Sequence, residues 1–225
     1  MQVICIIGTD TEIGKTYSCC QIMKYLANNN QLIAALKPIA SGVMPCEFGS
    51  LNEDVYQLFK ASNYALNFEQ INPFSFRKAI APHIAAKQQA QILNVAEITY
   101  KITQTISQSI MANHILIEGI GGLMVPLNET ETYLDLLIKW KYPVILVVGM
   151  KIGCLNHALL TEMVLKSNNL SLVGWIANQI DPKMACYKEN LDYLKRKLSV
   201  PLLASISYQG YLQPTKQFLE LFQCH

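Results

Sequence analysis

The stretch GTDTEIGKT, residues 8–16, decides how this chain folds. An apolar run at residues 3–7 precedes it, and apolar residues at helical spacing follow it. A strand, a glycine-bounded loop, a Lys-Thr pair and a helix, in that order, are what a phosphate-binding loop requires. Backbone N–H groups that converge before a helix N-terminus attract anions. The stretch therefore predicts a nucleotide-phosphate site in which Lys15 reaches the outer phosphates and the Thr16 hydroxyl ligates Mg²⁺.

The spacing inside this loop departs from the common pattern. Five residues, rather than four, separate Gly8 from Gly14, so Thr9 occupies the position of the usual first glycine. A strand, a turn and a helix with a chance Gly-Lys-Thr is the alternative interpretation. We favour the phosphate loop because the order of its parts and its flanking elements both fit.

Composition points to one well-buried domain. Of the 225 residues, 51% are apolar and 15% are charged, which is enough for the core of a single α/β domain. The net charge of +2 gives no electrostatic reason to expect nucleic acid or a membrane surface as a partner. Seven cysteines, an odd number without a CxxC pair, indicate reduced and buried thiols. With no leader pattern and no apolar run long enough to cross a bilayer, we expect a cytoplasmic protein.

Strand and helix patterns alternate along the whole chain, without a linker or a repeat. This alternation predicts one domain over residues 1–225, a doubly wound, mainly parallel sheet with helices on both faces. The expected strands are residues 3–7, 32–39, 114–118, 143–148, 172–177 and 201–206. The expected helices are residues 16–27, 52–61, 95–112, 133–140, 156–167, 188–197 and 215–222, with Ile98, Ile102, Ile106 and Ile110 on one face of the third.

Polar residues follow the ends of the expected strands. Ligands of such sheets bind beyond the carboxyl ends of the strands, so these residues are expected on one rim. They are residues 8–16, 37–41, 118–122 and 151–156, and Asn178.

Three charged residues on this rim have two interpretations each. Glu118 ends an apolar strand, where phosphate-loop proteins place a second Mg²⁺ ligand, or it caps the next loop. Asp54 is either a further metal ligand or a favourable charge at a helix N-terminus. Lys37 ends a buried strand, so it either points at the same phosphates as Lys15 or extends its ammonium to solvent from the strand end.

The uncharged residues on this rim also have two interpretations each. The glycines at 119, 121 and 122 either let the backbone approach a ligand or form a flexible turn. Residues 153–156 start a helix, where Asn156 is an N-cap or free N–H groups hold a carboxylate. Asn178 either reads a base edge through its amide or forms a turn. The four histidines show no metal-ligand spacing.

Taken together, these segments resemble the dethiobiotin synthetase family, ATP-dependent ligases that close the ureido ring in biotin synthesis. The matching segments run in order and cover most of the chain. They are GTDTEIGKT (8–16), LKPIASG (36–42), NEDVYQL (52–58), NPFSF (72–76), APHIAA (81–86), LIEGIGG (116–122), PVILVVGMKIGCLNHALLT (143–161) and GWIAN (174–178).

The resemblance implies a seven-stranded P-loop NTPase fold and a homodimer in which the second subunit holds the substrate carboxylate. It implies ATP, Mg²⁺, CO₂ and 7,8-diaminononanoate as ligands, and a carbamate and a carbamic–phosphoric anhydride as intermediates. Lys15 and Lys37 correspond to the catalytic lysines. The implied metal ligands are Thr16, Asp54 and Glu118. The implied nucleotide-binding residues are Glu12, Ile13, Gly14, Lys15, Thr16, Tyr17, Glu118 and Asn178. The implied substrate-binding residues are Thr11, Lys37, Ser41, Gly121, Gly153, Cys154, Leu155 and Asn156.

Some positions differ from the family pattern. Ile120 replaces a small residue, Ala204 and Ser207 replace Gly and Pro near the adenine site, and Asn190 replaces a substrate-contacting Tyr.

Two other functions fit the fold less well. A partition-type or septum-positioning ATPase that switches a protein partner often has a Lys at the position of Thr9. A cobalamin-type amidotransferase ligase needs a glutaminase domain, for which 225 residues leave no room.

Overall fold

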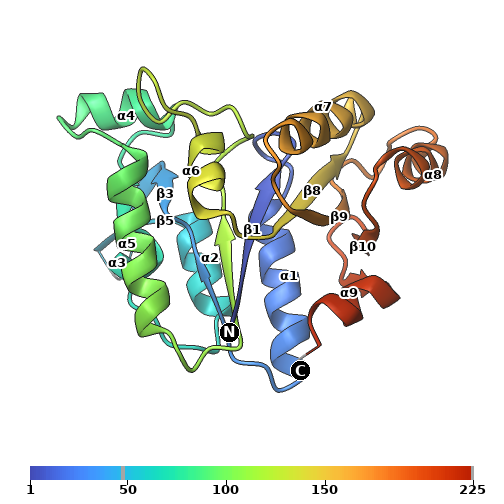
Figure 1. Cartoon of the computed structure of the whole chain (residues 1–225), viewed down its shortest axis with the longest axis horizontal. Coiled ribbons are helices and arrows are strands. Elements are labelled where there is room, and N and C mark those ends of the chain that lie inside the picture. Colours follow the sequence, from blue (N-terminus) through green and yellow to red (C-terminus); the bar gives the residue numbers. More distant parts are fainter. Residues whose placement is uncertain (47–48, 224–225) are drawn as a thin grey trace.

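Seven strands form one sheet through the middle of the molecule, in the order β11-β10-β9-β8-β1-β7-β2 (Figure 1). The computed structural model describes residues 1–46 and 49–223. Neighbouring strands pair in parallel except β10 and β11, which are antiparallel. The strands are β1 (Gln2–Gly8), β2 (Ile33–Leu36), β7 (His114–Glu118), β8 (Val144–Met150), β9 (Leu172–Gln179), β10 (Leu202–Ile206) and β11 (Leu212–Pro214).

Helices cover both faces of this sheet, so its strands are buried on both sides. Side chains alternate along β1: Ile4 and Ile6 face one apolar cluster, and Cys5 and Ile7 face the other. The helices are α1 (Lys15–Asn28), α2 (Glu53–Ala61), α3 (Phe68–Ile71), α4 (Pro82–Gln88), α5 (Val95–Gln108), α6 (Tyr133–Trp140), α7 (Cys154–Ser167), α8 (Tyr187–Lys197) and α9 (Lys216–Leu221).

The doubly wound parallel sheet predicted from the sequence is confirmed, and the central position of β1 follows from its pairing with β7 and β8. Because β1 lies between them, the loop at residues 9–14 emerges at the middle of the carboxyl edge and leads directly into α1. No helix among the described residues is long and apolar enough to span a bilayer.

The strand expected at residues 32–39 is interrupted. The main-sheet strand β2 ends at Leu36, and β3 (Ile39–Ser41) pairs instead with β6 (Phe74–Phe76) in a separate two-stranded sheet. Pro38 lies at the break, where it can donate no ladder hydrogen bond. The chain therefore turns away from the main sheet directly after Lys37.

Two small antiparallel elements carry no strong sequence signal. β4 (Val43–Cys46) and β5 (Gly49–Asn52) form a hairpin, and the three-residue strand β11 adds the seventh strand at one edge. Their brevity leaves too few residues for an alternating pattern to be recognised.

Helix boundaries correct two further predictions. α5 ends at Gln108 rather than residue 112, because Ser109 forms the C-cap, and Ile110 is 74% exposed instead of joining the buried face. α7 begins at Cys154, with Gly153 as its N-cap at φ 91°, so Asn156 is not the N-cap. A left-handed φ is the backbone conformation that glycine adopts without strain.

Among the cysteines, Cys5, Cys19, Cys20 and Cys154 are buried free thiols, and Cys186 is exposed. Burial raises the pKa of Cys20 to about 12, which leaves it protonated and unreactive. The predictions for the side chains of Cys46 and Cys224 lie outside what the structure describes.

Gly149 in β8 allows the phosphate loop to lie against the sheet. A Cβ atom at this position would lie 2.6 Å from the Cβ of Ile13. Gly149→Ala is therefore expected to lower the free energy of unfolding by about 1–3 kcal/mol and to weaken ADP binding, because Ile13 must move with its loop. Urea unfolding and titration calorimetry measure the two effects.

Gly174→Ala is the matched control. Its Cβ atom would meet Leu203 at 2.4 Å, away from the phosphate loop. This variant should lose stability and keep the wild-type affinity for ADP. Equal ADP affinities in the two variants would contradict the role of Gly149.

Candidate active site

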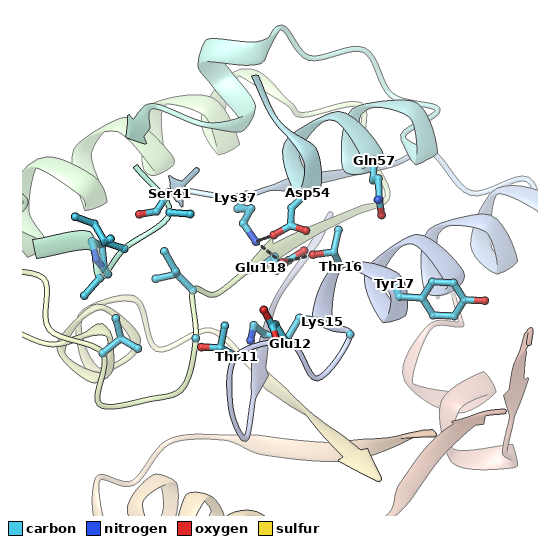
Figure 2. Close-up of a pocket in the computed structure, with 18 of the residues that line it drawn as sticks. Thr11, Glu12, Lys15, Thr16, Tyr17, Lys37, Ser41, Asp54, Gln57 and Glu118 are labelled. Atoms are coloured by element: carbon cyan, nitrogen blue, oxygen red, sulfur yellow. Dashed lines mark hydrogen bonds and ion pairs between the residues drawn. The ribbon is translucent and has the colours of Figure 1, made fainter. Parts of the chain in front are cut away.

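A cavity of about 830 Å³ opens at the carboxyl edge of β1, β7 and β2. Its lining comes from the phosphate loop, the start of α1, the segment after β2, the start of α2, residues 79–82 and the loop after β7 (Figure 2). It brings together these residues proposed from the sequence: Thr11, Glu12, Gly14, Lys15, Thr16, Tyr17, Lys37, Ser41, Asp54, Glu118 and Gly121.

The phosphate loop ends at Gly14, which is the N-cap of α1 at φ 77°. No side chain of residues 1–46 or 49–223 caps this helix, so its first N–H groups are available to an anion. A Cβ atom at Gly14 would lie 2.2 Å from the Nδ2 atom of Asn178, so glycine is required for space as well as for φ. The start of α1 thus has the backbone geometry that the predicted anion site requires.

Asn178 supports the phosphate loop from behind. Its Nδ2 atom donates a 2.9 Å hydrogen bond to the Ile13 carbonyl, and its side chain is buried. Neither Ile13 nor Asn178 lines the cavity. The amide nitrogen that was expected to read a base edge is therefore bound to the protein backbone.

Lys15 is buried and its Nζ atom donates a 2.7 Å hydrogen bond to the Asp10 carbonyl. Burial lowers the pKa of Lys15 to about 8, although the nearby Glu118 carboxylate opposes this change. The adjoining loop is held by Asp10, which accepts a hydrogen bond from the Thr11 backbone N–H and lies 3.6 Å from the Lys151 ammonium. The Thr11 hydrogen bond contributes most to a lowered pKa of Asp10.

Lys37 lies between two carboxylates. Its Nζ atom donates to Glu118 Oε1 at 2.5 Å and to Asp54 Oδ2 at 2.7 Å (Figure 2). Burial alone would lower the pKa of Lys37, but Glu118 and then Asp54 raise it above its usual value. Lys37 is only 4% exposed, so the alternative of an ammonium extended into solvent is wrong.

The same carboxylates and a hydroxyl are suited to a hard cation. Thr16 Oγ1 donates a 2.7 Å hydrogen bond to Glu118 Oε1, while Glu118 Oε2 is buried and has no hydrogen-bond partner among the described residues. Burial opposes ionisation of Asp54, but the Lys37 ammonium keeps its pKa below the usual value. An unpaired carboxylate oxygen, a second carboxylate and a hydroxyl fit Mg²⁺ on a nucleotide, which needs only one or two protein carboxylates.

The side of the cavity that contains Ser41 combines the hydroxyl of this residue with apolar side chains. Ser41 lines the cavity, and its Oγ atom is buried without a hydrogen-bond partner in the part of the chain that the structure describes. Gly121, at φ 58°, lies beside Thr11, whose Oγ1 atom would be 3.3 Å from a Cβ atom at that glycine. This wall also contains Ile80, Ile120, Val125 and Pro126.

Sequence reasoning missed the apolar part of this wall. Loop residues such as Ile80 and Val125 carry no chemical signal, because exposed apolar residues are common on protein surfaces. The only sequence signal for Ile80 was its position next to the segment APHIAA, residues 81–86.

The four residues proposed to hold a carboxylate lie elsewhere. Gly153, Cys154, Leu155 and Asn156 form the start of α7 and do not line this cavity. Asn156 is exposed, and α7 also begins without a side-chain cap. Asn190 lies in α8, where its amide donates to the Cys186 carbonyl at 2.9 Å.

Comparisons with known proteins agree with this geometry. A family model described as an AAA domain matches residues 2–216. The chain is 43% identical to an ATP-dependent dethiobiotin synthetase BioD of Legionella pneumophila (strain Paris) over 206 residues, covering 91% of this chain and 93% of the relative. It is 40% identical to the enzyme of the same name from Pseudoalteromonas translucida (strain TAC 125) over 225 residues, covering 99% and 98%.

Solved structures with similar folds are more distant in sequence. The cell division protein FtsY of Thermotoga maritima superposes with a TM-score of 0.56 at 16% identity, covering 100% of this chain and 69% of its own. MinD of Aquifex aeolicus superposes with a TM-score of 0.53 at 13% identity, covering 99% and 86%. At these identities the similarity shows the P-loop fold alone.

The buried Lys15 ammonium should cost stability. Because its folded pKa of about 8 lies below the unfolded value of about 10.5, the penalty is complete below pH 8 and disappears as the pH rises to 10.5. Lys15→Met is expected to raise the free energy of unfolding by about 1–3 kcal/mol at pH 7, at about 1.4 kcal/mol per pKa unit. The gain should shrink at pH 10, and phosphate binding should be lost.

Urea unfolding at both pH values measures this difference. Lys24→Met, at an exposed position of the same helix, is the control and should change stability little. A Lys15→Met variant no more stable than wild type at pH 7 would contradict the assigned pKa.

Proposed function

Because the chain belongs to the family of ATP-dependent dethiobiotin synthetases, we propose that it uses ATP to join CO₂ to 7,8-diaminononanoate and close the ureido ring. The products are dethiobiotin, ADP and phosphate. The observation that carries this assignment is the Lys37 ammonium, held by Glu118 and Asp54 in the cavity that also contains the phosphate loop. A partition-type ATPase often has its second lysine at the position of Thr9, whereas the second lysine of this cavity is Lys37, at the end of β2.

The nucleotide phosphates bind to the loop that ends at Gly14, and Lys15 leaves the Asp10 carbonyl to contact them. Thr16, Asp54 and Glu118 hold Mg²⁺, which supplies positive charge to the phosphates when it is bound. The unpaired Glu118 Oε2 supports this ligand set. Glu12 and Tyr17 contact the nucleotide at the rim of the cavity, while Ile13 and Asn178 support it through the loop backbone.

The diamine and its carbamate occupy the side of the cavity that contains Ser41. Thr11, Ser41 and Gly121 contact the polar end, and the apolar wall of Ile80 and Val125 accommodates the hydrocarbon. One amine of the diamine adds to CO₂, which forms a C–N bond and releases a proton to give a carbamate anion. Lys37 and Lys15 offset the repulsion between this anion and the γ-phosphate.

A carbamate oxygen then attacks the γ-phosphorus, and the bond to the ADP oxygen breaks. Phosphoryl transfer depends mainly on positioning and on charge stabilisation, which the two lysines provide. The second amine attacks the carbonyl carbon of the resulting carbamic–phosphoric anhydride. This step forms the ring C–N bond, breaks the C–O bond, and expels phosphate with loss of the amine proton.

The substrate carboxylate is assigned to a second copy of the chain. The uncapped N–H groups at Gly153–Asn156 favour an anion, but this helix start lies outside the cavity that contains Lys37. A homodimer supplies the helix start from the partner, so each active site uses two subunits.

Incubation with ATP, Mg²⁺, bicarbonate and 7,8-diaminononanoate is expected to yield ADP and a product of dethiobiotin mass, and Lys37→Met should abolish this product. Nucleotide binding by the variant, measured by calorimetry, should persist. Removing the cation leaves the buried Glu118 carboxylate without its charged partner, so the variant should lose about 3 kcal/mol of stability. A Lys37→Met/Glu118→Gln double variant should recover part of the stability and none of the activity.

Folded wild-type protein that binds ATP and makes no product would refute the assigned reaction. Near-normal turnover by Lys37→Met would refute the catalytic role of that lysine alone.

Mixing two inactive variants tests the shared site. Lys37→Met disables one half of each site, and Asn156→Asp places a negative charge where the partner should hold the carboxylate. Mixed dimers contain one site in which both halves are intact, so activity absent from either variant should return on mixing. Native mass spectrometry, with one variant isotope-labelled, verifies that the variants exchange subunits. Exchanged dimers that stay inactive would contradict a carboxylate site supplied by the partner.

A further inference from the structure

The side chain of Asn52 joins two parts of the proposed active site. Asn52 is the last residue of β5 and the N-cap of α2, and it is 8% exposed. Its Oδ1 atom accepts from the backbone N–H groups of Asp54 at 3.0 Å and Val55 at 3.4 Å. Its Nδ2 atom donates to the backbone carbonyls of Ser41 at 2.9 Å and Gly42 at 3.2 Å.

Helix capping accounts for only half of these hydrogen bonds. An N-cap needs an acceptor, and Ser, Thr, Asp and Asn all provide one. Asn67 and Asn94 also cap helices, at the starts of α3 and α5, and each accepts N–H bonds there. For neither does the described part of the chain contain a bond donated by the amide. The Nδ2 atom of Asn52 therefore binds the Ser41 and Gly42 carbonyls and has no part in capping α2.

This backbone has left the main sheet and needs other support. After Pro38, β3 pairs with the short strand β6, and the Gly42 N–H is held by the Phe76 carbonyl at 2.9 Å. The next residue, Val43, pairs with Asn52 in the β4–β5 ladder. At the opposite end of the segment, the buried amide of Asn72 donates to the Lys37 carbonyl at 2.6 Å. Amide side chains thus hold both ends of the segment that carries Lys37 and Ser41.

We propose that Asn52 is a positioning residue that sets the spacing between Ser41, the substrate contact, and Asp54, the metal ligand. This inference rests on the proposed function, since it assigns an effect to those two residues. A single planar amide contacts both backbones, so a shift of either one is transmitted to the other. Only an amide side chain combines the two donors with the acceptor that this junction requires.

Asn52→Ser separates the two tasks of this side chain. Serine retains a capping acceptor for α2, but its hydroxyl cannot reach both carbonyls. The KM for the diamine is expected to rise about tenfold, the effect of losing hydrogen bonds worth about 1.4 kcal/mol together, while the KM for ATP stays unchanged. Asn52→Asp keeps the side-chain shape and the capping oxygen but replaces the two donors by an acceptor. This variant should also raise the KM for the diamine.

Hydrogen exchange gives a readout that does not depend on turnover. Backbone amides of residues 38–45 should exchange faster in Asn52→Ser than in wild type, and those of α2 should not. Asn94→Ser, at the start of α5 and remote from the cavity, is the matched control and should change neither the KM values nor exchange in residues 38–45.

Wild-type KM for the diamine and wild-type exchange in Asn52→Ser would overturn the role of Asn52, as would an equal rise of the KM values for the diamine and ATP. Wild-type protein that makes no product would instead overturn the proposed function. The two failures are therefore distinguishable.

Discussion

The proposed active site depends on one ion cluster, in which the buried Lys37 ammonium lies between the buried carboxylate of Glu118 and the partly exposed carboxylate of Asp54. The proposed reaction requires two lysines in one cavity to offset the charge of a carbamate and a triphosphate, and burial disfavours both ammonium groups. The carboxylates keep the pKa of Lys37 high. Among the described residues, Lys15 has no carboxylate in direct contact, and burial lowers its pKa to about 8. The same carboxylates serve as the proposed metal ligands, so one set of acidic groups serves stability and chemistry.

The fold supplies the members of this cluster from separate parts of the chain. Glu118 ends β7, Lys37 follows β2, and Asp54 lies in the first turn of α2. Parallel pairing of β2 with β7, and of β7 with β1, fixes the first two beside the phosphate loop. Asp54 lies outside the main sheet. Its position relies on Asn52, which accepts a hydrogen bond from the Asp54 backbone N–H and donates one to the Ser41 carbonyl.

The sequence predicted the main sheet and most of the polar site because both depend on local patterns. Long apolar runs and the stretch at residues 8–16 specify the sheet, and residues that follow its strands must meet at one edge. The break after Lys37 and the hairpin β4–β5 were not predicted, because their strands are short and are specified by tertiary hydrogen bonds. The hydrogen bonds donated by Asn52 were missed for a related reason. Asn52 looks like an ordinary N-cap in the sequence, and its amide donates to the backbone carbonyl of Gly42, ten residues earlier. The resemblance, rather than any spacing, singled out Asp54 as a metal ligand.

The central claim is that these residues place a carbamate oxygen on the γ-phosphorus. Turnover in ¹⁸O-labelled bicarbonate, with mass analysis of the released phosphate, tests it most directly. If the anhydride forms, the phosphate retains the attacking carbamate oxygen and carries one ¹⁸O atom derived from bicarbonate. Phosphate without label from bicarbonate, in a reaction that still yields dethiobiotin, would contradict the account.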